Sequence, residues 1–297
     1  MPTLTAGDFQ SLLSPTLPKS CLDIIASCDW GYENILGDPL HRLFDDFVHR
    51  LHSKAFTDTH SGKTRWIAGW AENRDAFIAS QNTTDLIPKY IRPDKPMRLM
   101  GRFIQPHAPD FEWNWYRLFQ TWIFETQLAP YDSIYEFGCG SGVNLARFKE
   151  MAPHKHYVGL DWVQPAVDCV KSFGCEGRLF DFNKPDYSIN LPQNTAVFTF
   201  GALEQVTDAT DFIKWCLVKK PALCVFVEPI YEYYNKQNLA DYLAIRAHEI
   251  RGFVRGLSTK LHALLNEGAV NIGQDRRAHI GSLVLEGYSR IVWRPTI

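Results

Sequence analysis

The residues best suited to chemistry in this 297-residue chain gather in a glycine-rich stretch, YEFGCGSG at positions 135–142. Gly138, Gly140 and Gly142 follow a short apolar run and precede a helical pattern, so they allow a tight turn and close approach of a ligand. Dinucleotide sites use the spacing GxGxxG, but here the third glycine comes one residue early. Glu136, two residues ahead of the first glycine, would repel a pyrophosphate. The stretch therefore predicts a ligand that carries positive charge and no phosphate.

Two further acids follow at the ends of the next two expected strands. Asp161 closes VGLD, and Asp181 lies in LFDF. A single acid at a strand end is usually a turn or capping residue. Three acids at the ends of three successive strands favour one shared ligand, because these ends meet at the same edge of a parallel sheet. S-adenosylmethionine (SAM) has an ammonium, a sulfonium and a ribose diol, and it fits such a set.

On these residues the chain resembles the class I SAM-dependent methyltransferases, over residues 131–227 and loosely to the C-terminal end. The resemblance implies SAM as cofactor, an acid on the ribose at Asp161 and an acceptor for the adenine amino group at Asp181. The chain after Pro229 is also loosely similar to methyltransferases of bacterial sugar and polysaccharide pathways, which implies a saccharide acceptor. The cofactor-binding residues implied are Glu136, Gly138, Cys139, Gly140, Gly142, Asn144, Asp161, Trp162, Asp181, Phe182, Gly201 and Ala202.

Methyl transfer to a hydroxyl group needs a base near the acceptor, and two candidates carry this prediction. Glu204, in GALEQV, follows the fourth expected strand and would face the acceptor; its alternative is a solvent-facing acid at a helix start. His248 lies in AHEIRGFVRG and shares a helical face with Arg251 and Arg255. That face would suit an anionic or polar acceptor, or it is a solvated helix face of mixed charge.

Glu228, at the end of CVFVEP, is a further candidate for the base and for contact with the acceptor. We therefore expect Glu204 and His248 as catalytic residues and Arg251, Arg255 and Glu228 as substrate-binding residues. No histidine or cysteine set has the spacing of a metal site, so we expect no metal.

Short apolar strands alternate with helical segments from about residue 131, which indicates a parallel α/β sheet with helices on both faces. Strands are expected at 133–137, 156–160, 177–182, 195–200 and 222–227, and helices at 143–152, 164–173 and 211–220. A long helical stretch at 236–267 has glycine breaks at Gly252 and Gly256. Residues 279–287 and 289–295 predict a terminal antiparallel hairpin. The resemblance makes this a Rossmann-like methyltransferase domain, residues 126–297.

The first 125 residues differ from the rest, with prolines and short helical patterns, and they predict a mainly helical cap over the substrate region. One helix is expected at residues 111–128, with an apolar stripe facing the sheet domain.

The net charge, the apolar runs and the cysteine count of the chain exclude some classes of function. The net charge of −2 exerts no general pull on nucleic acid or an anionic membrane. No run of about 18 apolar residues or secretory pattern is visible, and seven scattered cysteines do not form a disulfide framework. These features predict a cytoplasmic protein without a membrane span, with a small-molecule or saccharide substrate and no nucleic acid partner.

The resulting prediction is a SAM-dependent methyltransferase that acts on a small molecule or saccharide, at oxygen. Alternative interpretations of the same residues are a methyltransferase acting on protein and a non-catalytic module that binds SAM. An NAD-dependent oxidoreductase is disfavoured by Glu136 and by the glycine spacing.

Overall fold

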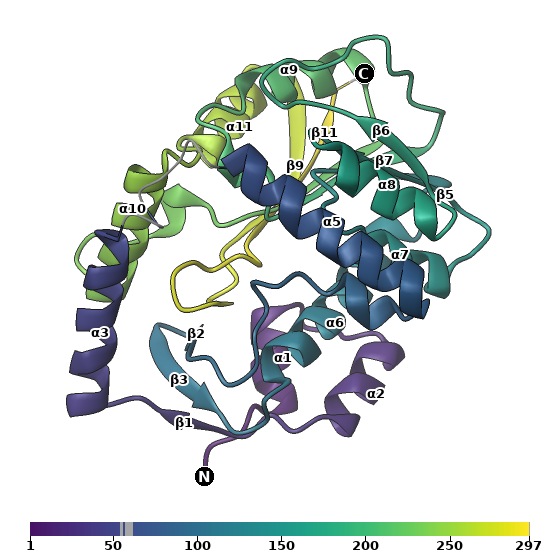
Figure 1. The fold of residues 1–297 in the computed structure, drawn as a ribbon. Coiled ribbons are helices and arrows are strands. Elements are labelled where there is room, and N and C mark those ends of the chain that lie inside the picture. The colour runs from purple at the N-terminus through teal and green to yellow at the C-terminus, as the bar shows by residue number, and fades with distance from the viewer. Residues whose placement is uncertain (54–55, 57–61, 297) are drawn as a thin grey trace.

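A seven-stranded sheet forms the centre of the molecule in the computed structural model, which describes residues 1–53, 56 and 62–296 (Figure 1). The strand order is β6-β5-β4-β7-β8-β11-β9, with the first five strands parallel and β11 antiparallel to both β8 and β9. This confirms the predicted α/β class with an antiparallel terminal pair. The strand bounds are β4 Ser133–Phe137, β5 His156–Asp161, β6 Glu176–Leu179, β7 Thr195–Phe200, β8 Leu223–Val227, β9 Val270–Arg276 and β11 Arg290–Pro295.

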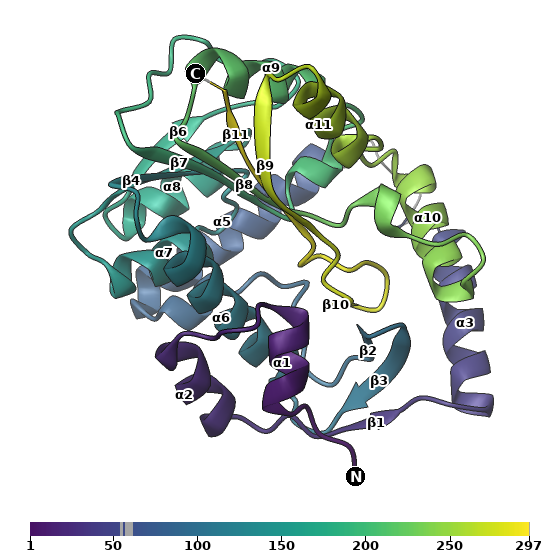
Figure 2. The same cartoon turned by 180° about the vertical axis from the view of Figure 1, so that it is seen from behind.

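Helices bury both faces of the sheet, which explains why its strands are apolar along their whole length. Alternate residues of β4 enter opposite cores: Ile134 packs in one, and Tyr135 and Phe137 pack in the other. The first core is shared with α6 Phe111–Ile123, α7 Val143–Met151 and α8 Gln164–Ser172, and the second with α9 Thr210–Lys219 and α11 Leu257–Asn266. Figure 2 shows α6 and α7 from the side opposite to that of Figure 1.

The terminal hairpin forms from a different segment than the sequence predicts. Residues 279–287 contribute only the two-residue strand β10 Ile280–Gly281, which pairs with β2 Met97–Leu99 of a second sheet. The partner of β11 is β9, a strand with exposed and half-exposed positions at one end of the large sheet. Its polar sequence hides it from a search for apolar runs, since an edge strand does not need two apolar faces.

The N-terminal region combines helices with a small antiparallel sheet, which the prediction of a mainly helical cap lacks. This four-stranded sheet has the order β1-β3-β2-β10, so its last strand comes from beyond residue 126. The remaining elements are α1 Ala6–Leu12, α2 Lys19–Ser27, β1 Tyr32–Asn34, α3 Asp38–Leu51, α5 Gly62–Ser80, η1 Thr83–Leu86 and β3 Arg102–Pro106. The helix expected at 111–128 continues from α6 into a π-helical turn, η2 Phe124–Leu128.

The predicted helical stretch at 236–267 is two helices, α10 Leu239–Arg251 and α11, and the two expected glycine breaks are confirmed. Gly252 ends α10 with a left-handed φ of 64°, and Gly256 precedes α11 with a φ of 81°. Figure 1 shows α10 beside α3, and the two helices are in contact. None of the described helices, including the 19-residue α5, is long and apolar enough to cross a bilayer.

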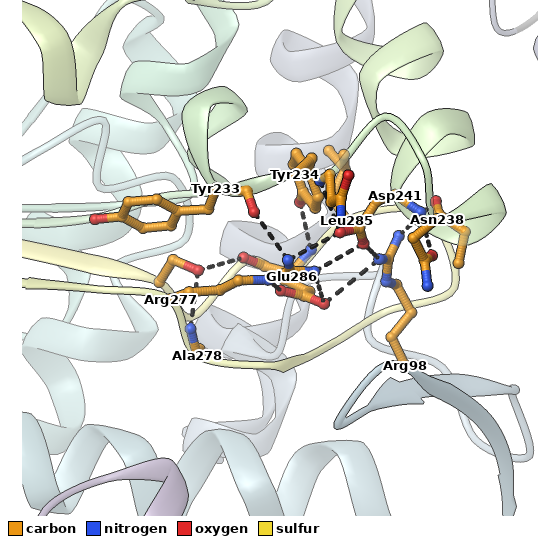
Figure 3. Close-up of polar contacts among 12 residues, drawn as sticks. Arg98, Tyr233, Tyr234, Asn238, Asp241, Arg277, Ala278, Leu285 and Glu286 are labelled. Atoms are coloured by element: carbon orange, nitrogen blue, oxygen red, sulfur yellow. Dashed lines mark hydrogen bonds and ion pairs between the residues drawn. The ribbon is translucent and has the colours of Figure 1, made fainter.

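A buried cluster of four charges ties the N-terminal sheet to α10 and to the C-terminal segment (Figure 3). Arg98 of β2 pairs with Asp241 of α10 and lies 3.4 Å from Glu286. Arg277 bonds the same two carboxylates, at 2.7 Å to Asp241 and 2.6 Å to Glu286. Two cations and two anions balance, so each buried charge has a partner. The cluster fixes the segment that carries Leu285, which lines the second of the two cavities described below.

Candidate functional site

The predicted glycine loop joins β4 to α7, and its shape depends on the absence of side chains. Gly138, Gly140 and Gly142 have φ values of 72°, 54° and 73°, a region that favours glycine. A Cβ on Gly138 would overlap that of Ala202, and one on Gly140 would lie 2.8 Å from the Trp70 ring. The loop is held by the Gly138 amide, which donates to the Leu160 carbonyl at 2.7 Å.

Glu136 and Asp161 lie buried beside this loop, 1% and 5% exposed. Oε1 of Glu136 accepts from Asn144 Nδ2 at 2.6 Å, whereas its Oε2 is buried with no partner among the described residues. Asp161 accepts from the Gly140 amide at 3.0 Å and the Val163 amide at 3.2 Å.

Burial is the main electrostatic influence on both carboxyls. It raises the pKa of Glu136 to about 8, against the lowering effect of the Asn144 hydrogen bond, with a small further rise from Asp161. It raises the pKa of Asp161 to about 6, against the lowering effect of its amide donors. Burial thus favours the protonated form of both carboxyls. A cationic ligand bound beside them would favour the ionised form, because opposite charges attract.

Asn144 is the centre of a buried polar network behind Glu136. Its Oδ1 accepts from the Tyr116 hydroxyl and from Gln120 Nε2, both at 2.9 Å. These donors leave the Asn144 amide nitrogen to bond Glu136, so α6 sets the orientation of the carboxylate.

Trp162, which follows β5, and Asp181, which follows β6, line the same cavity as the glycine loop. The volume of this cavity is about 870 Å³, including its open mouth. Asp181 accepts from the Asn183 amide at 2.8 Å, and Trp162 is 39% exposed with the Lys63 ammonium 5.4 Å from its ring centre. All twelve predicted cofactor residues except Gly142, which lies at the start of α7, line this first cavity. They come together around one cavity, as the sequence predicts.

A second cavity adjoins the first and has about 2090 Å³ of space, with its open mouth included. The two share Trp66, Trp70, Tyr90, Tyr116, Phe200, Gly201 and Gln205. Trp66 and Trp70 of α5 stack with ring centres 5.3 Å apart. These aromatic residues were not predicted as site residues. Their spacing of four places them on one helical face, but nothing in the sequence shows that this face meets the glycine loop.

Glu204 lines the second cavity, as predicted for a residue facing the acceptor. Its Oε2 is buried without a hydrogen-bond partner among the described residues. Burial, followed by the charge of Glu228, raises its pKa well above the usual value. Its carboxyl is thus harder to ionise than that of an exposed glutamate.

Glu228 has a supporting place instead of the predicted contact with substrate. It is fully buried, lines neither cavity and accepts from the amides of Ala202 at 3.0 Å, Leu203 at 3.1 Å and Glu204 at 3.1 Å. Burial raises the pKa of Glu228, against the lowering effect of these hydrogen bonds, and the three amide donors fix the loop that separates the two cavities.

His248, predicted as a catalytic residue, lines neither cavity in this geometry. It is fully buried, with Tyr231, Tyr234 and Phe253 rings centred 5.7 to 5.8 Å away. Both ring nitrogens lack a properly aligned partner among the described residues, and burial lowers the pKa of His248 to about 4. The neutral imidazole packs as an aromatic ring.

The two predicted substrate-binding arginines separate because α10 ends between them. Arg251 is the last residue of α10 and lines the second cavity. Gly252 then reverses the chain, so Arg255 is exposed and lines neither cavity. The expected continuous face of His248, Arg251 and Arg255 does not exist.

Comparisons with known proteins give similar structures of low sequence identity. No family model and no curated protein sequence matches this chain. The structure is similar to human N-acetylserotonin methyltransferase crystallised with SAM, at 12% identity, a TM-score of 0.47 and coverage of 88% of this chain and 68% of that one. It is also similar to LaPhzM, at 14% identity and a TM-score of 0.44. That match covers 63% of this chain, which spans 57% of LaPhzM.

A third similar structure is the pyocyanin biosynthetic protein PhzM, at 14% identity and a TM-score of 0.43, with 64% of this chain and 60% of that chain covered. At these values the likeness is limited to a broadly shared α/β architecture. The function proposed next is therefore argued from the residues of this chain.

Proposed function

We propose that this protein is a SAM-dependent methyltransferase that binds SAM in the first cavity and methylates a hydroxyl oxygen of a small-molecule or saccharide acceptor in the second. The observation that carries the proposal is the buried carboxyl pair at the glycine loop, Glu136 and Asp161, with Oε2 of Glu136 unpaired. A cation would favour the ionised form of both carboxyls, whereas a phosphate would gain no such attraction and would be repelled by ionised Asp161, which disfavours a dinucleotide.

The residues present fit the parts of SAM. The unpaired oxygen of Glu136 suits the ammonium, and Asp161 keeps lone pairs free for the two ribose hydroxyls. Asp181 and Phe182, with Trp162 beside them, would hold the adenine. Gly138 and Gly140 let the backbone line the cavity at places where Ala202 and Trp70 leave no room for a side chain.

SAM, when bound, would supply an electrophilic methyl group: an acceptor oxygen would bond to the methyl carbon in line as the bond to sulfur breaks and SAH leaves. The chain must then align the acceptor and receive its proton. Glu204 is the carboxyl on the acceptor side, and its raised pKa makes its ionised form a stronger base than an exposed glutamate. We therefore expect turnover to rise with pH as Glu204 ionises.

The shape of the second cavity supports a small molecule over a protein acceptor. It opens directly into the first cavity through shared residues, and aromatic rings such as Trp66, Tyr90 and Phe253 line it. Aromatic faces of this kind bind the rings of sugars and of aromatic compounds. A SAM-binding module without catalysis would have no need of this adjoining space.

The experiment that tests this function compares Asp161→Asn with Asp168→Asn, an α8 residue that lines neither cavity. SAM and its demethylated product SAH should raise the unfolding temperature of the wild type and of Asp168→Asn, and Asp161→Asn should lose that shift. Release of SAH is then measured with a panel of hydroxyl-bearing acceptors. Equal shifts in all three proteins would refute the ribose assignment, and SAM binding without release of SAH from any acceptor would favour the non-catalytic alternative.

A further inference from the structure

The second cavity concentrates positive charge in a chain whose net charge is −2. Its cationic lining residues are Arg50, Arg65, Lys89, Arg92 and Arg251. Lys89 pairs with Glu72. Within the described part of the chain, the four guanidinium groups have no carboxylate partner at ion-pair distance.

The two acids of the same cavity offset little of this charge. Burial raises the pKa of Glu112 to about 7 and raises that of Glu204 well above its usual value. Near neutral pH Glu112 is about half ionised, and burial disfavours the charged form of Glu204. With five cationic and two acidic side chains in its lining, the cavity carries an excess of positive charge.

Arg251 is held in place while part of its guanidinium stays available. Nη1 donates to the Phe56 carbonyl at 3.0 Å, and the group lies 5.1 Å from the Phe56 ring centre and 5.5 Å from that of Phe253. Its Nε and Nη2 donate to no residue that the structure describes. Rings that fix one part of a guanidinium leave its remaining donors ready for a planar or tetrahedral oxyanion.

Arg65 of α5 adds a second cation near the first. After burial, repulsion from Arg65 is the main influence that lowers the pKa of Arg251. Two like charges on the wall of one cavity repel each other, and an anion bound between them would remove that cost. Beside them, Trp66 and Trp70 offer a stacked aromatic surface to a ring.

We propose that the acceptor is a small anion: a ring compound whose carboxylate or phosphate binds Arg251 and Arg65, with its reactive hydroxyl directed toward Glu204. This inference rests on the proposed function, because it names the substrate class of the cavity next to the SAM site. The carboxylate and the phosphate share the chemistry that two guanidinium groups recognise, and the test separates them.

The test uses two matched pairs of probes on protein saturated with SAH: 4-hydroxybenzoate with 4-hydroxybenzamide, and glucose 6-phosphate with glucose. Binding is measured by titration calorimetry or ligand-observed NMR. In at least one pair the anion should bind on the order of tenfold more tightly than its neutral partner, as expected for a charge-assisted hydrogen bond. The pair that shows this preference identifies the anionic group.

Arg251→Gln and Arg65→Gln should each reduce the affinity of the preferred anion to near that of its neutral partner. Arg255→Gln is the matched control, because Arg255 is exposed and lines neither cavity. Arg65 is also exposed, so its variant tests the site without removing a packed side chain. The proposal is overturned if neither anion binds better than its neutral partner, or if the Arg255 variant loses as much affinity as the other two.

SAH binding is measured separately in every variant. If the wild type does not bind SAH, the proposed function is refuted. If it binds SAH but shows no preference for an anion, only the proposed class of acceptor is refuted.

Discussion

Replacing Glu136 by glutamine tests the electrostatic basis of the SAM site. The pKa of about 8 means that Glu136 is protonated in most empty molecules at neutral pH. A cation bound beside it favours the ionised form, so binding must release the proton. At pH 6.5 that release costs about 2 kcal/mol, or roughly 30-fold in affinity, and at pH 8.5 it costs almost nothing.

The ratio of wild-type to Glu136→Gln affinity for SAM should therefore rise roughly 25-fold between pH 6.5 and 8.5. Comparison with the variant removes the titration of the ligand's own amino group. The assay is titration calorimetry at several pH values, repeated in two buffers of different ionisation enthalpy to count the protons released. A ratio that stays constant with pH would refute the reasoning, because it would mean that Glu136 does not change its charge on binding.

Glu136→Gln should also change the stability of the protein without ligand, in a direction that follows from the pKa shift of Glu136. The folded-state pKa of about 8 lies above the usual 4.5, so the stabilising contribution is present below pH 4.5 and is lost as the pH rises toward 8. Between pH 5.5 and 7.5 the wild type should lose about 1.4 kcal/mol per pH unit relative to Glu136→Gln. Urea unfolding of both proteins at three pH values measures this difference, and parallel pH profiles would contradict it.

Three further substitutions test the packing around the two cavities. Gly138→Ala should abolish SAM binding and lower stability by about 1 to 3 kcal/mol, because its Cβ would meet that of Ala202. Gly101→Ala is the control, because Gly101 has a φ of 76° but open space around it, so this variant should show the backbone strain alone. Calorimetry measures SAM binding, and thermal unfolding measures stability. His248→Phe should keep turnover and equal or exceed wild-type stability in urea, since both ring nitrogens are unpaired, and loss of turnover in a stable variant would restore a catalytic role. Arg98→Met should cost about 3 to 5 kcal/mol in urea unfolding because it leaves buried Asp241 and Glu286 with Arg277 alone; a loss below about 1 kcal/mol would show that the cluster is not needed.

The parallel sheet and the first cavity could be predicted from the sequence because both depend on local signals. Strands buried on two faces are apolar throughout, and a ligand site at their carboxyl ends brings together residues that each follow a strand. Gly138, Asp161 and Asp181 were found in this way. The strand β9 was missed because an edge strand needs only one buried face.

The acceptor side could not be predicted in the same way, because its walls come from distant segments. Trp66, Arg65 and Arg251 meet only after α5 and α10 have packed on the sheet domain. Sequence also says little about the burial of a single polar residue, and for that reason the complete burial of His248 was not predicted. Its neighbours Tyr234 and Phe253 come from the segments before and after α10, so they meet His248 only once the chain has folded around this helix.

The most direct test of the central claim is calorimetric titration of the purified wild-type protein with SAM, SAH and NAD. The proposal predicts micromolar binding of SAM and SAH, with no detectable binding of NAD. Binding of NAD, or of none of the three, would contradict it, and Glu136, Asp161 and Asp181 would then have to be explained as residues that only stabilise the fold.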